Sequence, residues 1–255
     1  MSDAKKTYYI GLSMAGTVSA GTYTAGSLIE LDRWLSKWQE AAENNKPIWL
    51  KALYDAGPYK KGDPVQVDPS EFPDHEVKIA ALTGTSGGGV GATLYMLGLA
   101  TGRLDELVRG TWQDFNIKKM LNTDDLSSMD KSVYSILNVL PIEEVISKIK
   151  TIKWDHSSRL DKIRYIADTV ELYQTLTSYE AIPYSIVPYN NTAAGIFNNH
   201  YDYIRFGISK SHITGGLDSS KPYRYELKVT NGQPLILDAA WMKLVESTPA
   251  TGAFP

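Results

Sequence analysis

Residues 77–99 read VKIAALTGTSGGGVGATLYMLGL, and this stretch decides the fold. The apolar run Val77 to Leu82 has the length of a buried strand, and it stops at a glycine-rich turn. The residues from Val90 to Leu99 are small or apolar, which predicts a buried helix. A strand, a tight turn and a helix in this order are typical of the start of a βαβ unit.

A second stretch near the beginning of the chain has the same organisation. The apolar, aromatic-rich run Thr7 to Met14 leads into small residues, and an amphipathic helical pattern follows from Leu28 to Trp38. Two such units predict an α/β protein with a mainly parallel central sheet and helices on both faces, a three-layer α/β/α arrangement. We expect the strands Tyr8–Met14 and Val77–Leu82 to be parallel neighbours, with both glycine turns at one end of the sheet.

We expect the whole chain, residues 1–255, to form one domain. Residues 44–76 are rich in proline and glycine and predict a long surface insertion, and the polar, mixed segment 116–138 is a candidate lid. Further elements are expected as a helix from Pro141, a helix over Leu160–Leu176, strands at Tyr184–Val187, Tyr203–Ser209 and Tyr223–Val229, and a last helix capped by Asp238.

Composition excludes several classes of function. Hydrophobic residues make up 43% and charged residues 22% of the 255 residues, which is typical of a globular protein. The net charge of −3 and the lack of a basic block argue against nucleic-acid binding. The chain has no cysteine and only 4 histidines, so we expect no disulfide and no metal site. The uncharged stretches 7–29 and 79–102 are interrupted by glycines, which argues against a membrane-spanning helix.

The motif Gly84-Thr85-Ser86-Gly87-Gly88 fits the GxSxG pattern of a nucleophile elbow. It follows a predicted strand and precedes a predicted helix, the context that such an elbow requires. A serine on so sharp a turn has a strained backbone, and small residues two positions away, here Gly84 and Gly88, let the chain pass. We therefore expect Ser86 to be a nucleophile in an unusual backbone conformation at the amino end of a helix, where the helix dipole stabilises negative charge.

Two other interpretations use the same residues. The turn could simply be a glycine-rich connection that closes a βαβ unit. Alternatively, Gly87, Gly89 and Ala92 match a dinucleotide fingerprint, with Asp105 or Glu106 near the spacing of a ribose-binding acid. We favour the elbow because these glycines begin only after a serine that the elbow explains.

Three blocks of the sequence, in the same order, resemble patatin-like phospholipases. The segment Gly11 to Leu28 looks like the family's strand, glycine-rich oxyanion loop and helix beginning Gly-x-Leu. The turn Gly84 to Gly88 is similar to the family's GTSxG, and Ser247 to Pro255 resembles the small-residue, proline-containing segment before its catalytic aspartate. The resemblance implies a patatin-like fold and a lipid acyl hydrolase of phospholipase A type.

The resemblance also implies site residues and partners. It assigns the oxyanion hole to Gly16, Thr17 and Val18, the attack to Ser86, and the substrate to a phospholipid or another lipid ester at a membrane surface. We accordingly expect a cytoplasmic enzyme, peripheral at a membrane, and leave its oligomeric state open. No cofactor is implied.

The sequence departs from the family in two ways. The basic residue of the family's oxyanion loop is absent from Gly16 to Gly21, where Thr17 and Val18 replace glycines. No Asp-Gly pair follows Ser86, so the resemblance places the partner aspartate beyond residue 255 and makes this chain the N-terminal part of a patatin-like domain. None of the later histidines or aspartates has the expected context; these are His156, His200, His212, Asp218 and Asp238. The competing class is a non-catalytic lipid- or nucleotide-binding module on the same fold.

Overall fold

A computed structural model gives an α/β fold with a mixed, mainly parallel sheet. The residues that the structure describes are 6–17, 21–44, 75–114, 117–121, 138, 140–152, 159–187, 195–210, 216–217, 220–221, 224–228 and 238–252.

Within these residues the sheet has six strands, in the order β1-β2-β3-β4-β6-β5. They are β1 (Lys6–Met14), β2 (His75–Gly84), β3 (Ile166–Ile186), β4 (Gly195–Ser209), β5 (Gly216–Leu217) and β6 (Arg224–Leu227). Strands β1, β2 and β3 are parallel, β4 is antiparallel to β3 and parallel to β6, and β5 is antiparallel to β6. Met14 pairs with Gly84 at the ends of β1 and β2, so the prediction of parallel neighbours with both turns at one sheet end is confirmed.

The helical part is centred on α3, which the small and apolar residues after Ser86 form. Every residue of α3 from Gly87 to Ala100 is buried, and α3 packs on β1, β2, β3, α1 and α7. The helices are α1 (Gly21–Asn44), α3 (Gly87–Thr101), a π-helical turn η2 (Asp105–Arg109), α4 (Gly110–Asp114), α5 (Ile117–Met120), α6 (Leu140–Lys150), a 3-10 turn η4 (Arg159–Lys162) and α7 (Ala239–Gly252).

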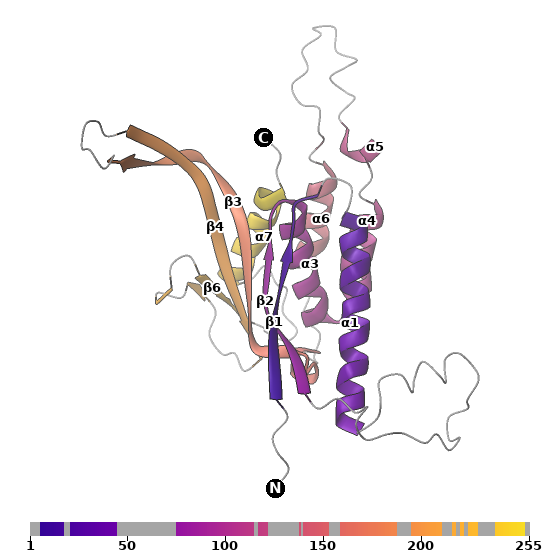
Figure 1. Cartoon of the computed structure of the whole chain (residues 1–255). Helices are drawn as coiled ribbons and strands as arrows, with labels where there is room; N and C mark the ends of the chain where they lie inside the picture. Colours follow the sequence, from indigo (N-terminus) through magenta and orange to yellow (C-terminus); the bar gives the residue numbers. More distant parts are fainter. Residues whose placement is uncertain are drawn as a thin grey trace.

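The strand order explains on which face the helices lie. From β1 to β3 the chain advances across the sheet in one direction, and right-handed crossovers then place α1 and α3 on the same face. Figure 1 shows α1, α3 and α6 together on one side of the strands. Leu82 and Phe206 lie on the face that the helices cover and are buried, whereas Ser13 lies on the other face and is exposed. The helical layer that we expected on the other face is not among the described residues.

One predicted element is wrong. Leu160 to Leu176 does not form a helix; its first residues form η4, and the rest belongs to β3. Ile166 and Val170, four residues apart, satisfy both a helical and an alternating pattern, because four is close to one helical turn and is also an even number. The buried Gln174 hid the alternation, since a polar residue stands where an apolar one is expected.

The predicted helix cap, insertion, lid and absence of a membrane-spanning helix can each be compared with the structure. Asp238 caps α7 as predicted, because its carboxylate accepts from the N–H groups of Ala240 at 2.8 Å and Trp241 at 3.3 Å. Of the predicted insertion (44–76) the structure describes only residues 44, 75 and 76, and of the predicted lid (116–138) only residues 117–121 and 138, so both stay predictions. No described helix combines the length and the apolar character needed to cross a bilayer.

Candidate active site

Ser86 lies where β2 passes into α3, and its backbone has φ 53° and ψ −129°. Among the described residues it is the only non-glycine with positive φ, so the predicted unusual conformation is confirmed. The turn is fixed by backbone hydrogen bonds. Thr85 N–H donates to Met14 O at 3.2 Å, Gly88 N–H to Thr85 O at 2.9 Å, and Gly89 N–H to Ser86 O at 2.8 Å. A strained residue persists only where its surroundings determine it in this way.

The glycines around Ser86 are required by close approach of the backbone. A Cβ atom on Gly84 would lie 2.3 Å from the carbonyl oxygen of Gly88. A Cβ atom on Gly88 would lie 2.3 Å from the carbonyl oxygen of Met14, at the end of β1. Gly84 and Gly88 are the two positions of the motif that the sequence predicted to be small for this reason.

The turn after β1 lies against the turn after β2. A Cβ atom on Gly16 would be 3.3 Å from Ser86 Cβ and 4.0 Å from Ser86 Oγ. One on Gly87 would be 2.5 Å from the carbonyl oxygen of Thr17. The structure therefore brings Gly16 and Thr17 to the serine, while Val18, the third predicted oxyanion residue, lies outside the described part of the chain.

The local electrostatics favour negative charge beside Ser86. The amino end of the 15-residue helix α3 starts at Gly87, and its first turn contains no acidic residue. The Ser86 side chain makes no capping hydrogen bond to this helix, so its hydroxyl is not occupied in that way. A helix amino end of this kind stabilises an anion that forms next to it.

No general base reaches Ser86 within the described residues, where no carboxylate or imidazole is hydrogen-bonded to its hydroxyl. The ring nitrogen Nδ1 of His200 is 2.9 Å from the carbonyl oxygen of Ser178, far along β3 and β4. Asp105 and Glu106 form exposed ion pairs with Arg109 and Arg103. His156, His212 and Asp218 lie outside the described residues.

A buried polar network below the turn was not predicted. Gln174 on β3 is fully buried; its amide donates to Thr93 Oγ1 at 2.5 Å, and its carbonyl accepts from Ser247 Oγ at 2.5 Å. Thr93 Oγ1 donates in turn to the carbonyl oxygen of Gly89 at 3.0 Å, in the first turn of α3. The network thus links β3 and α7 to the helix that carries Ser86. The one signal in the sequence is the polar Gln174 at a core position of an alternating strand.

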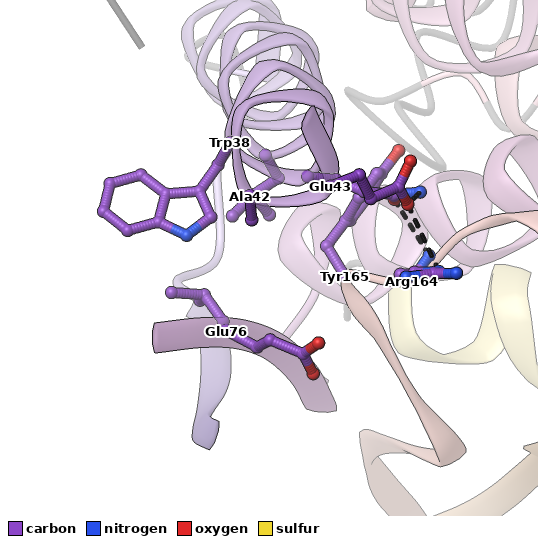
Figure 2. A pocket seen from close by; sticks show the side chains of 9 residues that line it. Trp38, Ala42, Glu43, Glu76, Arg164 and Tyr165 are labelled. Atoms are coloured by element: carbon purple, nitrogen blue, oxygen red, sulfur yellow. Dashed lines mark hydrogen bonds and ion pairs between the residues drawn. The ribbon is translucent and has the colours of Figure 1, made fainter. Parts of the chain in front are cut away.

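The cavities found along α1 are not at this site. One of about 280 Å³ is lined by residues that include Trp38, Glu43, Glu76 and Arg164 (Figure 2). Glu76 is near the start of β2, whereas Ser86 follows its end, so the cavity lies at the opposite end of the strands. Within the cavity, the Arg164 side chain pairs through Nε with Glu43 at 3.2 Å. The backbone N–H of Arg164 donates to Gln39 Oε1 at 2.9 Å. We assign no ligand to this cavity.

Comparison with known proteins finds a distant relative. The chain is 22% identical over 291 residues to a protein of Sinorhizobium fredii (strain NBRC 101917 / NGR234) named "Uncharacterized protein y4iI". The alignment covers 99% of this chain and 36% of that protein, so the chain spans about a third of the relative's length. No family model and no solved structure matches the chain.

Proposed function

We propose that this chain carries the nucleophile of a serine-dependent lipid acyl hydrolase with a patatin-like, three-layer fold. The observation that carries the proposal is the conformation of Ser86, a positive-φ serine on a strand-to-helix turn held between glycines and placed against Gly16. Strain of this kind is concentrated at functional sites, and a turn that only closed a βαβ unit would not need it. The resemblance to patatin-like phospholipases supports a lipid ester as substrate and a membrane surface as the place of action.

In the proposed reaction, Ser86 Oγ attacks the ester carbonyl carbon while a base takes the hydroxyl proton. Following the resemblance, the base is an aspartate in an Asp-Gly turn beyond residue 255. Backbone N–H groups of Gly16, Thr17 and Val18 hold the oxyanion of the tetrahedral intermediate, with the amino end of α3 adding favourable potential. Collapse expels the alcohol, which receives the proton, and water then hydrolyses the acyl-serine to release the fatty acid and restore Ser86.

A non-catalytic binding module on the same fold, for lipid or nucleotide, is the second candidate. It is favoured by the β-branched Thr17 and Val18 in place of loop glycines and by the absence of a base at Ser86 among the described residues. Such a module would keep the fold and the apolar surfaces and lack turnover.

Ester hydrolysis by the protein in its natural length separates the two candidates. We expect release of fatty acid from phosphatidylcholine, and Ser86→Ala to lower it by at least about 10³-fold, as removal of a covalent nucleophile does. Ser13→Ala is the matched control, because Ser13 is an exposed serine at the same end of the sheet. Activity that survives Ser86→Ala, or no activity in the unsubstituted protein, would favour the binding module.

A further inference from the structure

Strands β3 and β4 continue past the rest of the sheet as a two-stranded arm. The pairing of β2 with β3 ends at Gln174, and β6 pairs with β4 only over Arg205–Ile208. Beyond these points the described parts of β3 and β4 pair with each other, as far as Ile186 and Gly195. Figure 1 shows this arm curving away from the helices. A two-stranded ribbon alone is marginally stable in water, so contact with a further surface would stabilise the arm.

One face of the arm is apolar and rich in tyrosine. Register partners share a face of a sheet, and Tyr184 pairs with Phe197, with ring centroids 5.9 Å apart. Tyr201 and Tyr203 follow on the same face, 6.3 Å between ring centroids. We call the apolar residues of this face the aromatic strip; they are Ile182, Tyr184, Ile186, Phe197, Tyr201 and Tyr203. The same face also has the polar residues Asn199, which pairs with Ile182, and Thr177, which pairs with Tyr201. Tyr184 is 47% and Phe197 49% exposed, far more than residues of a packed core.

The aromatic strip begins beside the nucleophile turn. Thr175 pairs with Tyr203 and so lies on the same face of the sheet. Its hydroxyl donates to Thr85 Oγ1 at 3.0 Å, and Thr85 directly precedes Ser86. A surface that held the strip would therefore also lie near the serine.

The charge of the arm selects among possible partners. The sequence contains no lysine or arginine between Arg164 and Arg205, so the arm has nothing to attract phosphate-rich or anionic surfaces. Tyrosine and other amphipathic aromatic residues are instead enriched where lipid headgroups meet hydrocarbon. A neutral, zwitterionic lipid surface fits both observations.

Addition of a further protein strand fits the arm less well. Pro183 lies in the outer part of β3 and offers no N–H to a new ladder, and the register shifts between Thr177 and Ile182. Proline and bulges of this kind are typical of edges that avoid strand pairing. Among the described residues no strand pairs with the outer edges of the ribbon, and unpaired backbone groups do not enter hydrocarbon. Contact through one face at headgroup depth is therefore the arrangement that remains.

We propose that the aromatic strip docks on a zwitterionic lipid surface and brings the Ser86 turn to it. The use of this docking for lipid hydrolysis rests on the proposed function, but the docking itself needs no catalysis. The partner is defined by chemistry: a neutral headgroup layer over acyl chains.

The test is co-sedimentation of the whole chain with phosphatidylcholine vesicles, in a Ser86→Ala background so that the lipid is not consumed. We expect Tyr184→Ser combined with Phe197→Ser to weaken vesicle binding by about tenfold or more, from the apolar area lost. Ile196→Ser is the matched control. Ile196 pairs with Ser185 on the other face of the arm, and it is 78% exposed. Ile196→Ser should change vesicle binding by no more than about twofold. Neither higher salt nor added anionic lipid should strengthen the binding of the protein with an intact strip.

Three results would overturn the docking proposal: no vesicle binding, equal loss from Ile196→Ser, or binding that depends on anionic lipid. A fourth is a dimer in the absence of vesicles that the double substitution dissociates, since the strip would then join two copies of the chain. Failure of the hydrolase proposal is seen separately. With Ser86 retained and the protein in its natural length, the Tyr184→Ser and Phe197→Ser variant should hydrolyse a soluble short-chain ester as the unsubstituted protein does. Vesicle binding can hold even if neither protein has activity.

Discussion

In the turn after β2, backbone atoms of three segments approach so closely that glycines are required, whereas the outer half of the β3–β4 arm pairs with no other strand among the described residues. The turn is sterically restricted, because a Cβ atom on Gly84, Gly87 or Gly88 would collide with backbone atoms of a neighbouring segment. The arm has an exposed apolar face and few internal restraints. The difference separates the part of the molecule where local steric exclusion fixes the structure from the part where a contact outside the chain is expected to complete it.

The largest effect is expected from a methyl group placed in the turn. Gly88→Ala puts a Cβ atom 2.3 Å from the Met14 carbonyl oxygen, and neither backbone segment can yield without breaking β1 or α3. We expect the free energy of unfolding to fall by about 4 kcal/mol or more, measured by urea denaturation, or the protein not to fold.

Gly26→Ala is the control for this substitution. Gly26 is an exposed residue of α1, and a Cβ atom there meets nothing within 4 Å. It should stabilise the protein by about 0.5–1 kcal/mol, because alanine is the better helix former. Equal losses at Gly88 and Gly26 would mean that the turn is not closely packed.

The next effect concerns the base of the arm, which is held by ion pairs between a buried arginine and two partly exposed carboxylates. Arg224 is 1% exposed, and its guanidinium donates to Glu171 on β3 at 2.9 Å and to Glu226. Burial lowers the pKa of this guanidinium, but the hydrogen bonds with the two carboxylates outweigh burial and raise it. Arg224→Met removes the charge at similar length and leaves Glu171 with only its longer, 3.8 Å contact to Arg205. We therefore expect a loss of about 3 kcal/mol in urea denaturation.

The exposed pair Arg103–Glu106 provides the comparison for that loss. Arg103→Met breaks an ion pair at the surface and should cost no more than about 1 kcal/mol. If the two substitutions cost the same, burial does not distinguish the base of the arm from the surface.

A smaller effect of opposite sign is expected at the serine itself. Ser86→Gly removes a side chain that positive φ disfavours, so the free energy of unfolding should rise by about 1 kcal/mol while ester hydrolysis is lost. Thermal or urea unfolding of the variant beside Ser86→Ala checks this. A Ser86→Gly protein that is less stable than Ser86→Ala would show that Ser86 is not strained.

The smallest effect is expected on the aromatic strip. The Tyr184→Ser and Phe197→Ser double variant should change the free energy of unfolding by about 0.5 kcal/mol, since both side chains are half exposed and pair mainly with each other. A loss of several kcal/mol, measured in the same way, would place these side chains in the core and remove the contrast with the turn.

The sequence predicts the turn much better than the arm, for a physical reason. Gly84, Ser86 and Gly88 act over five residues, so their spacing alone carries the steric argument, and it holds in the structure. The strand β3 has no such local signal, because its burial pattern arises from α3 and α7 on one side, and Gln174 disguises it. The partners of Ser86 are equally non-local: only the family resemblance indicates Gly16 as an oxyanion residue, and no spacing in the sequence indicates the base.

Covalent labelling of Ser86 tests the central claim most directly. The protein in its natural length is treated with an alkyl fluorophosphonate, which reacts with activated serines, and the adduct is mapped by peptide mass spectrometry. We predict a single adduct on Ser86, none on Ser13, and no labelling of Ser86→Ala. A protein that hydrolyses lipid ester but carries its adduct on another residue, or one that is labelled equally after Ser86→Ala, would contradict the assignment of Ser86 as the nucleophile.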